Sequence, residues 1–425
     1  MRILFLNPTG EIGGAEAALL ELLTGLRELQ PSWSLRLLAT SDGPLLARAA
    51  ALGVQTRVLP FPPALARLGE WGLRHGYASR AALAAKCARA AWPARGYMRQ
   101  LRHTIQEFAP DLVHTNGLKM HLLGAWARPE GTAVLWHMHD YVRRRGFSAS
   151  LLRRCAHRCS AVVANSESVA NDVRHVCRPL PVRPIWNAVD LTHFSPIGPK
   201  LDLDQLSGLP AADDDVVRVG LVATFARWKG HSTFLQALAM LPQSPVVRGY
   251  VVGGPVYETE GSQVNLDHLR LEAAALGLAC VGFTGFVPDP APALRALDIV
   301  VHASAEPEPF GLVIAEAMAC GKAVVASQSG GAAELVTDGV DALAHTPGDV
   351  AGLASRIAKL ASDQELRRRL GHAARATAER CFTRRRLASE FIPIYQYAIR
   401  QAPDFADDAL SRHAGASSGG GRANG

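Results

Sequence analysis

The 425-residue sequence is poor in the features that mark a secreted, disulfide-bonded or membrane-spanning protein. It has only seven cysteines, an odd number scattered along a long chain, which does not suggest a disulfide framework. No stretch approaches the roughly 20 apolar residues of a membrane-spanning helix. The apolar run at the start is shorter than the roughly 7–15 residues of a secretory signal. We therefore expect a cytoplasmic protein, with any membrane contact peripheral and on the inner face of the cytoplasmic membrane.

Patterns for metal and cofactor binding are scarce as well. Cys155 and Cys159 lie four residues apart, but no second Cys or His pair completes a zinc site, so we interpret them as buried thiols. Asp202 and Asp204 form an Asp-x-Asp pattern, but they lie in a Pro- and Gly-rich stretch and are interpreted as spacer. The pattern G-x-G-x-x-G does not follow the first strand, which disfavours a nicotinamide cofactor. We expect neither a metal nor a cofactor.

What the sequence does have is enough apolar material for two or three globular domains, with 48% hydrophobic and 20% charged residues. The net charge of +7 is unevenly distributed: residues 1–190 carry +11, and residues 191–425 carry −4. This asymmetry suggests two units that face different partners.

Short apolar runs alternate with helix-like segments, which predicts doubly wound α/β domains with buried parallel strands. The expected strands are residues 3–6, 35–39, 112–114, 133–137 and 161–164 in the first half, and 216–223, 248–252, 281–284, 299–303 and 323–327 in the second. We place an N-terminal domain at 1–190, a linker at 191–215 and a second domain at 216–383. A helix at 384–400 is expected to pack back on the first domain, and a disordered tail follows at 401–425.

The most specific motif extends from Glu308 to Lys322, after the expected strand 299–303. A helix is expected from about Gly311 to residue 320, closed by Gly321. The start of such a helix offers N–H groups and a positive dipole end to a phosphate. Glu308 lies before this start and Glu316 two turns later, so the two carboxylates can accept hydrogen bonds from different hydroxyls of one elongated ligand.

Two further turns follow strands and suit a diphosphate. Arg227 and Lys229 follow the strand that ends near 223, and both are cations. Gly13 and Gly14 follow the first strand and precede a helix, where glycine lets the backbone approach a ligand closely. A solvated basic turn and a simple tight turn are the alternative interpretations.

Taken together, these motifs resemble the large retaining glycosyltransferase family 4, whose GT-B fold has two facing Rossmann-like domains with a cleft between them. The resemblance extends from residue 1 to about 400. Further matching segments are His139-Asp140, Asn165-Ser166, Asn187 to Asp190 with Phe194 and Pro196, Gly253-Gly254, Gly285 to Val287, and Gly330-Gly331 with Glu334.

The resemblance implies that the domain 1–190 faces the acceptor and that the domain 216–383 binds the nucleotide-sugar donor. It also implies a role for each motif. Glu308 would contact the sugar of the donor and Glu316 the ribose, while Gly13 and Gly14 would lie near the leaving phosphate and His139 near the transferred sugar. Lys229 would neutralise the diphosphate. The start of the short helix would bind the donor through the segment Phe310, Gly311, Leu312 and Val313.

One position departs from the family pattern. The family's Arg, five residues before the Lys, is Thr224 here. Arg227 either replaces that missing cation or points away from the site.

The activity implied is retaining transfer of a sugar from a nucleoside diphosphate sugar to a glycan or lipid-linked acceptor, in cell-envelope polysaccharide or glycolipid synthesis. The alternatives are a nucleotide-sugar epimerase with the same fold and a non-catalytic nucleotide-sugar-binding protein. Nucleic-acid binding lacks a supporting motif.

The basic segments 67–103 and 143–158 are expected to contact an anionic membrane or a lipid-linked diphosphate, with a solvated basic helix face as the alternative.

Overall fold

The computed structural model describes residues 1–66, 80–244, 246–254, 264–279 and 281–402, so the segments 67–79, 255–263 and 403–425 and residues 245 and 280 lie outside the description. The chain divides into two compact units, which are described separately. Unit 1 comprises Met1–Ala164, Ala170–Arg183 and the chain from Ser389 onward. Unit 2 comprises Asn165–Val169 and Pro184–Ala388.

Unit 1 is built on a seven-stranded sheet in the order β3-β2-β1-β4-β5-β6-β7. The pairs from β3 across to β6 are parallel. The strand order reverses between β1 and β4, which makes the carboxyl ends of these two strands the topological switch point of the sheet. The strands are β1 (Arg2–Asn7), β2 (Ser34–Ala39), β3 (Gln55–Val58), β4 (Leu112–Asn116), β5 (Ala133–Met138), β6 (Ala161–Ala164) and β7 (Val182–Pro184).

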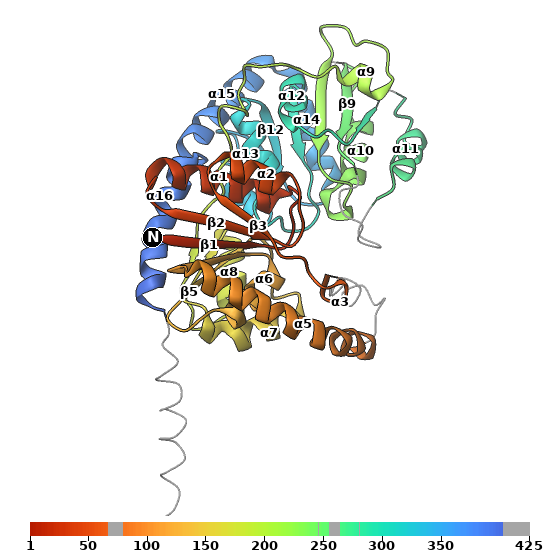
Figure 1. Ribbon diagram of the computed structural model, residues 1–425. Coiled ribbons are helices and arrows are strands. Elements are labelled where there is room, and N and C mark those ends of the chain that lie inside the picture. The colour runs from red at the N-terminus through yellow and green to blue at the C-terminus, as the bar shows by residue number, and fades with distance from the viewer. Residues whose placement is uncertain (67–79, 245, 255–263, 280, 403–425) are drawn as a thin grey trace, which may run out of the picture. The chain divides into compact units, whose positions relative to one another are not determined.

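Helices cover both faces of this sheet, as expected for buried parallel strands. Helices α1 and α2 lie on one side, and α5, α6 and α7 lie together on the other (Figure 1). The helices are α1 (Gly14–Leu29), α2 (Pro44–Ala51), α3 (Pro63–Ala66), α5 (Arg80–Phe108), α6 (Leu118–Ala127), α7 (Gly146–Cys155), the 3-10 turn η1 (Ala156–Arg158) and α8 (Glu167–Val176).

The last helix, α16 (Arg384–Arg400), supplies part of the core of unit 1. The rings of Phe391 and Tyr395 are fully buried and pack on His114 of β4. The Tyr395 hydroxyl also lies 2.8 Å from Nδ1 of His114. Unit 1 is therefore discontinuous in sequence, with its core completed by the C-terminal helix.

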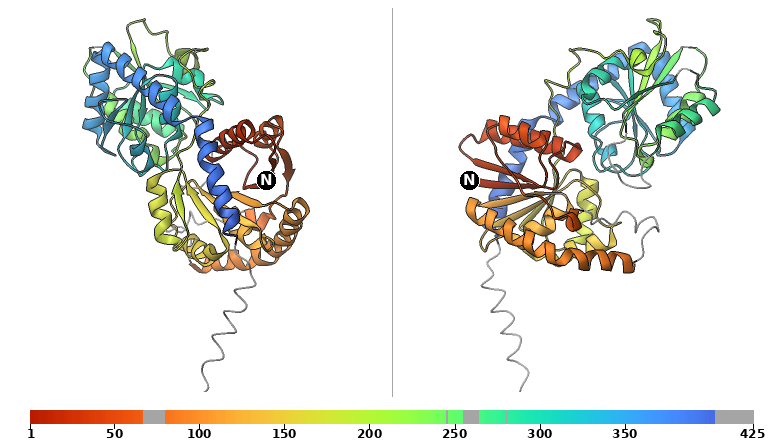
Figure 2. Two further views of the ribbon diagram at one scale, coloured as in Figure 1. Left: turned by 90° about the vertical axis from the view of Figure 1, so that its left-hand side faces the viewer. Right: turned by 45° about the vertical axis from the view of Figure 1, so that its right-hand side comes forward.

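Unit 2 has a six-stranded parallel sheet in the order β10-β9-β8-β11-β12-β13, with the switch point between β8 and β11. Figure 2 shows it enclosed by helices. The strands are β8 (Val217–Val222), β9 (Val247–Val252), β10 (Gly282–Gly285), β11 (Ile299–His302), β12 (Ala323–Ser327) and β13 (Leu343–His345). The helical segments are α9 (Leu203–Ser207), η2 (Arg227–Lys229), α10 (His231–Ala239), α11 (Leu266–Ala275), α12 (Pro290–Ala296), α13 (Leu312–Ala319), η3 (Gly331–Glu334), α14 (Val350–Ser362) and α15 (Gln364–Cys381).

The α/β class and all ten expected strands are confirmed, and three short strands were missed.

The segment 191–215 differs from the expected linker because it belongs to unit 2 and carries α9. Leu203 is buried in the core, and Asp202 caps the helix by accepting a hydrogen bond from the N–H of Gln205. Asp204 accepts hydrogen bonds from Arg248 and from the hydroxyl of Tyr250. The Asp-x-Asp pattern thus anchors this segment to the sheet.

The described part of the basic segment 67–103 is helical within α5, and residues 67–79 lie outside the description. Most of the expected disordered tail, residues 403–425, also lies outside the description. Among the described residues, no helix combines the length and the apolar character needed to span a bilayer.

Candidate active site

Two of the predicted site residues meet at the switch point of unit 2. Lys229 lies in the loop after β8, and Glu308 lies in the loop after β11, the strand paired with β8. In an open parallel sheet, ligands bind beyond the carboxyl ends of the strands at this point. The topology therefore places both side chains where a ligand is expected.

Lys229 and Glu308 form a two-pronged ion pair. The Nζ of Lys229 lies 2.8 Å from Oε1 and 2.9 Å from Oε2 of Glu308. The side chains retain 19% and 12% of their accessible surface, so the pair is largely shielded from solvent yet reachable by a ligand. A charge pair in such surroundings interacts more strongly than one at the open surface.

Two residues missed by the sequence analysis hold Glu308 in place. The hydroxyl of Ser304 donates a hydrogen bond to Oε2 of Glu308 at 2.8 Å. The Nε2 of His302 lies 3.5 Å from the same oxygen and 3.1 Å from the Ser304 hydroxyl. Both residues are buried at the end of β11. Their position at a strand end, a few residues before Glu308, is the sequence signal that could have identified them.

The surroundings keep Glu308 ionised. Burial raises the pKa of its carboxyl, but the charge of Lys229 and the hydrogen bond with His302 outweigh that effect and hold the pKa well below its usual range. At neutral pH, Glu308 is therefore a carboxylate rather than a proton donor.

The backbone around this pair allows little freedom. Gly230 has a φ of +74°, and a Cβ atom there would lie 1.9 Å from the carbonyl oxygen of Ala303. The N–H of Gly331 donates to the carbonyl oxygen of Glu308 at 2.7 Å, and a Cβ at Gly331 would lie 2.0 Å from the carbonyl oxygen of Pro309. These close approaches explain why glycine occupies both positions.

The expected short helix is α13, which follows Glu308 directly. Gly311 is its N-cap with a φ of +93°, and Leu312 and Val313 form its first turn, half-buried. The Phe310 side chain is buried, and its ring packs at 6.3 Å from that of Phe382. Phe310 is thus a core residue, and only its main chain is left for a contact with a ligand.

Glu316 is half-buried on α13, two turns from the start of that helix. Burial and the nearby charge of Asp289 raise the pKa of its carboxyl to about 7. Glu316 therefore changes charge near neutral pH, unlike Glu308.

This titration predicts a pH-dependent affinity for the ribose that Glu316 is expected to bind. The ionised carboxylate accepts hydrogen bonds from both hydroxyls of a ribose, and its fraction rises from about one tenth at pH 6 to about nine tenths at pH 8. The dissociation constant of the expected nucleotide-sugar ligand should therefore fall by up to about tenfold over this range, measured by calorimetry. Both phosphates of a nucleotide sugar are diesters and stay ionised throughout.

The control variants separate Glu316 from its neighbours. Glu316→Gln should bind more weakly and lose the pH dependence. The Nε2 of His193 lies 2.7 Å from the carboxylate of Asp289, and His193→Gln should keep the dependence. A flat profile for the unmodified protein would contradict the predicted role of Glu316.

The structure does not bring Arg227 to the ion pair. Arg227 is exposed in η2, whereas Lys229 in the same turn reaches Glu308. Thr224 precedes this turn, and its carbonyl oxygen accepts the N–H of Ala226. Lys229 is thus the cation that contacts Glu308, and a role for Arg227 toward a ligand stays a prediction.

Gly13, Gly14 and His139 belong to unit 1, at the carboxyl ends of β1 and β5. The turn at Gly13 is fixed by Glu16, which is buried in the first turn of α1. Its Oε2 accepts the N–H of Gly13, and its Oε1 accepts Nδ2 of Asn7, both at 3.1 Å. Glu16 therefore connects the glycine turn to the end of β1, a role that sequence reasoning missed.

Because the carboxylate of Glu16 holds the turn at Gly13 in place, Glu16→Ala should raise the KM for the expected sugar donor by about tenfold with a smaller change in kcat. Loss of the cap should also reduce stability by about 1 kcal/mol. Glu11→Ala is the matched control, since Glu11 is exposed in the same loop. An unchanged KM in Glu16→Ala, or an equal rise of KM in Glu11→Ala, would contradict the role of Glu16 in positioning the turn at Gly13.

His139 is a neutral, half-buried imidazole. Burial lowers its pKa to about 4, and its ring centroid lies 4.0 Å from that of His137. A neutral imidazole can exchange hydrogen bonds with a sugar hydroxyl but contributes no charge. The predicted contact with the transferred sugar is compatible with this state.

Glu334, which belongs to the Gly330-Gly331 motif, has a structural partner. Its carboxylate accepts the N–H groups of Glu167 and Ser168 at the start of α8, at 2.9 and 2.7 Å, and the Nε1–H of Trp186 at 3.1 Å. A carboxylate at a helix N-terminus is stabilising.

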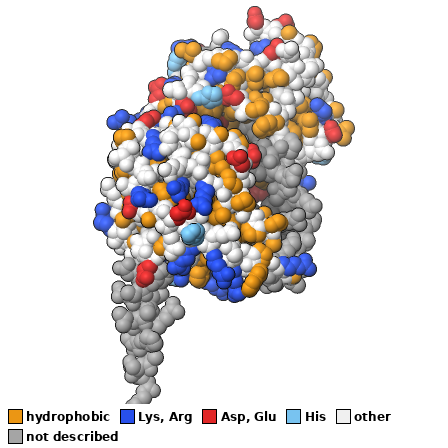
Figure 3. Space-filling model, viewed as in Figure 1, with side chains coloured by type: hydrophobic (Ala, Val, Ile, Leu, Met, Phe, Trp, Pro, Cys, Tyr) orange, Lys and Arg blue, Asp and Glu red, His pale blue; other side chains and the backbone are white. Residues whose placement is uncertain are grey.

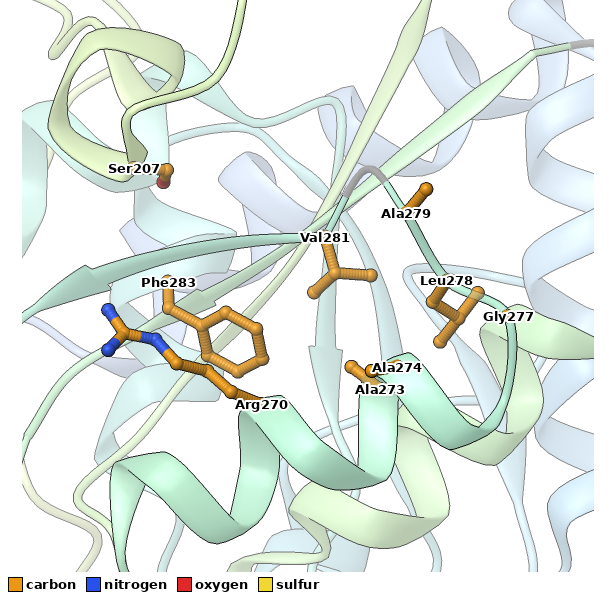
Figure 4. A pocket seen from close by; sticks show the side chains of 9 residues that line it. All are labelled: Ser207, Arg270, Ala273, Ala274, Gly277, Leu278, Ala279, Val281 and Phe283. Atoms are coloured by element: carbon orange, nitrogen blue, oxygen red, sulfur yellow. The ribbon is translucent and has the colours of Figure 1, made fainter.

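A separate cavity of about 490 Å³ lies beside the edge strand β10 (Figure 4). It is lined mostly by small and apolar residues of α11, β10 and the segment between them, with Arg270 and Ser207 as its polar members. None of the predicted site residues lines it.

Two family models match the chain, and together they cover most of it. Residues 12–193 match the model described as Glycosyltransferase Family 4, and residues 210–377 match the one described as Glycosyl transferases group 1. The first match ends at residue 193, and the second begins at residue 210.

Curated relatives are glycosyltransferases as well. The N-acetyl-alpha-D-glucosaminyl L-malate synthase of Bacillus anthracis is 27% identical over 59% of this chain and 63% of its own length. The D-inositol 3-phosphate glycosyltransferase of Saccharomonospora viridis is 33% identical over 51% of this chain and 50% of its own length. The chain thus spans between half and two thirds of these relatives.

Solved structures match over nearly the whole chain. HepE of Anabaena, in complex with UDP-glucose, has a TM-score of 0.73 and 28% identity over 93% of this chain and 99% of that chain. The same protein was also solved with UDP. The sucrose-phosphate synthase of Thermosynechococcus elongatus, at 21% identity and a TM-score of 0.72, shares the fold. Two Rossmann-like units of this kind constitute the GT-B fold.

Proposed function

Since the chain belongs to the family 4 glycosyltransferases, we propose that it transfers a sugar from a nucleoside diphosphate sugar to an acceptor hydroxyl, with retention of configuration at the anomeric carbon. The ion pair between Lys229 and Glu308 is the observation that carries this proposal. It places one fixed positive charge and one fixed negative charge at the switch point of unit 2, as the reaction requires.

The chemistry separates charge. As the bond from the anomeric carbon to the diphosphate oxygen breaks, the sugar becomes cation-like and the diphosphate gains negative charge. Lys229 and the first N–H groups of α13 would stabilise the departing diphosphate, and the carboxylate of Glu308 would face the sugar. Preorganised charges of this type account for much of the rate enhancement in many enzymes. This arrangement needs no metal ion.

Retention is proposed to result from attack by the acceptor on the face that the diphosphate leaves. Both carboxylate oxygens of Glu308 accept hydrogen bonds, from Lys229 and Ser304. Such a carboxylate is a poor covalent nucleophile, because attack would require it to give up these partners. This supports a role for Glu308 in binding and electrostatics.

We propose UDP as the nucleotide, on the strength of the complexes of HepE with UDP and UDP-glucose. The acceptor is proposed to be a glycan or a lipid-linked sugar of the cell envelope. The basic balance of residues 1–190 supports an anionic acceptor or membrane on the side of unit 1.

A thermal-shift screen against UDP-, GDP-, ADP- and dTDP-sugars tests the nucleotide. UDP-sugars should raise the melting temperature, since a ligand at 100 times its dissociation constant adds about 2.7 kcal/mol. Stabilisation by another nucleotide sugar alone would overturn the assignment of UDP, and stabilisation by none would overturn a nucleotide-sugar donor.

Product analysis with and without added acceptors then tests the reaction. Transfer should require an acceptor and give the anomeric configuration of the donor, seen in the proton coupling of the product. An inverted linkage would contradict retention. Acceptor-independent conversion of one nucleotide sugar to another would identify an epimerase.

A further inference from the structure

The long helix α5 has an outward face that combines an exposed tryptophan with arginines. Trp92 is 78% exposed, and Arg95, Arg99 and Arg102 are exposed as well. These positions recur at three- and four-residue intervals, which places them on one side of a helix. The opposite side is buried against unit 1 through Ala90, Tyr97, Leu101, Ile105 and Phe108.

The positive charge of this face is not offset locally. Among the described residues, no carboxylate pairs with Arg95, Arg99 or Arg102. The one acid within α5 is Glu107 at its end, and it forms an ion pair with Arg57 at 2.7 Å.

The neighbouring helices continue the same composition. Helix α6 contacts both α5 and α7. At the start of α7, Phe147 is 43% exposed, and Trp126 at the end of α6 is 46% exposed with the guanidinium of Arg158 over its ring at 4.3 Å. Around α7, the exposed cations are Arg143, Arg144, Arg153 and Arg154. Between these cations, Arg145 forms an ion pair with Asp140 at 2.8 Å.

We propose that this outer surface of α5, α6 and α7, the basic aromatic face, docks on the headgroup region of an anionic bilayer, with Trp92 entering the interface. Figure 3 shows groups of Lys and Arg side chains next to hydrophobic ones on this part of the molecule. Arginines attract anionic lipid, and tryptophan partitions to the depth of the headgroups. A helix with a cationic, aromatic outer side lies in the plane of a membrane surface rather than across it.

Vesicle co-sedimentation provides the test and requires no sugar donor, so its failure is distinguishable from failure of the proposed activity. Vesicles of phosphatidylcholine with 30% phosphatidylglycerol should bind the protein, and pure phosphatidylcholine should not. Each arginine at such a surface contributes about fivefold to the partition coefficient. The triple variant Arg95→Gln, Arg99→Gln, Arg102→Gln should therefore bind roughly 100-fold more weakly.

Matched controls come from unit 2. Arg270, Arg368 and Arg369 are exposed, and their replacement by Gln removes the same charge from another surface. Trp92→Ala should lower binding by about tenfold, while Leu271→Ala, at a 71% exposed position, should not. Brominated acyl chains should quench the fluorescence of the unmodified protein more than that of Trp92→Phe. This readout reports insertion and not charge alone.

Several outcomes would overturn the proposal. Equal binding to neutral and anionic vesicles would contradict an attraction between the arginines and anionic lipid. Equal losses of binding in the two triple variants would contradict the assignment of the docking surface to α5, α6 and α7. Binding of RNA or heparin without binding of vesicles would assign the face to a soluble polyanion. Melting curves of all variants ensure that a loss of binding is not a loss of fold.

Discussion

Glu308→Gln is expected to lower kcat by about 1000-fold while leaving the fold intact. The amide keeps the shape of the side chain and one acceptor oxygen but removes the negative charge beside Lys229 and the reacting sugar. A neutral group cannot stabilise a cation-like sugar, so the loss should appear in kcat more than in KM. Initial rates at saturating sugar donor measure it.

Ser304→Ala is the matched control for this variant. It removes one hydrogen bond to Oε2 of Glu308 but keeps the carboxylate and its contact with Lys229. We expect a loss of about tenfold, as for a single hydrogen bond to a charged group. Near-normal turnover by Glu308→Gln would contradict the assignment of the site. A larger loss of kcat in Ser304→Ala than in Glu308→Gln would indicate that Ser304, and not Glu308, has the larger role in transfer.

Lys229→Ala is expected to reduce kcat/KM by about 1000-fold, because it removes the fixed positive charge at the leaving diphosphate. It should weaken binding of the product UDP as well, since that product carries the charge which Lys229 neutralises. Calorimetry with UDP separates this binding effect from the catalytic one.

Arg227→Ala removes an equal charge two residues earlier and serves as the comparison. Because Arg227 is exposed and Lys229 contacts Glu308, the loss in Arg227→Ala should be at least 10-fold smaller, on the order of one charged hydrogen bond. Equal losses would show that Arg227 takes the place of the cation missing at Thr224. Unimpaired transfer by Lys229→Ala would contradict the proposed chemistry.

The positions of Lys229 and Glu308 could be predicted because each follows a buried strand. Buried parallel strands are continuous apolar runs, and their carboxyl ends meet at one edge of the sheet. The same reasoning failed for β13, a strand of only three residues, and for β3, whose residues are mostly exposed. Short or exposed strands lack the apolar run on which the prediction depends.

The residues that position the site residues could not be predicted from the sequence pattern. Glu16 reaches Asn7 nine positions earlier, and Ser304 reaches Glu308 across a loop, contacts that depend on how the loops fold. Asp204 was wrongly interpreted as part of a spacer. The composition around it is typical of a linker, yet its carboxylate is buried against Arg248 and Tyr250, more than 40 residues away. Local composition does not reveal such distant partners.

The discontinuity of unit 1 has a consequence for biosynthesis. Synthesis on the ribosome proceeds from the N-terminus, and domains often fold as they emerge. Here Phe391 and Tyr395 fill the space against His114, so the first unit to emerge lacks part of its interior until almost the whole chain has been made. Unit 2, which comprises Asn165–Val169 and Pro184–Ala388, is complete before that point. We therefore expect nascent chains halted before residue 389 to carry a protease-resistant second unit and a protease-sensitive first one.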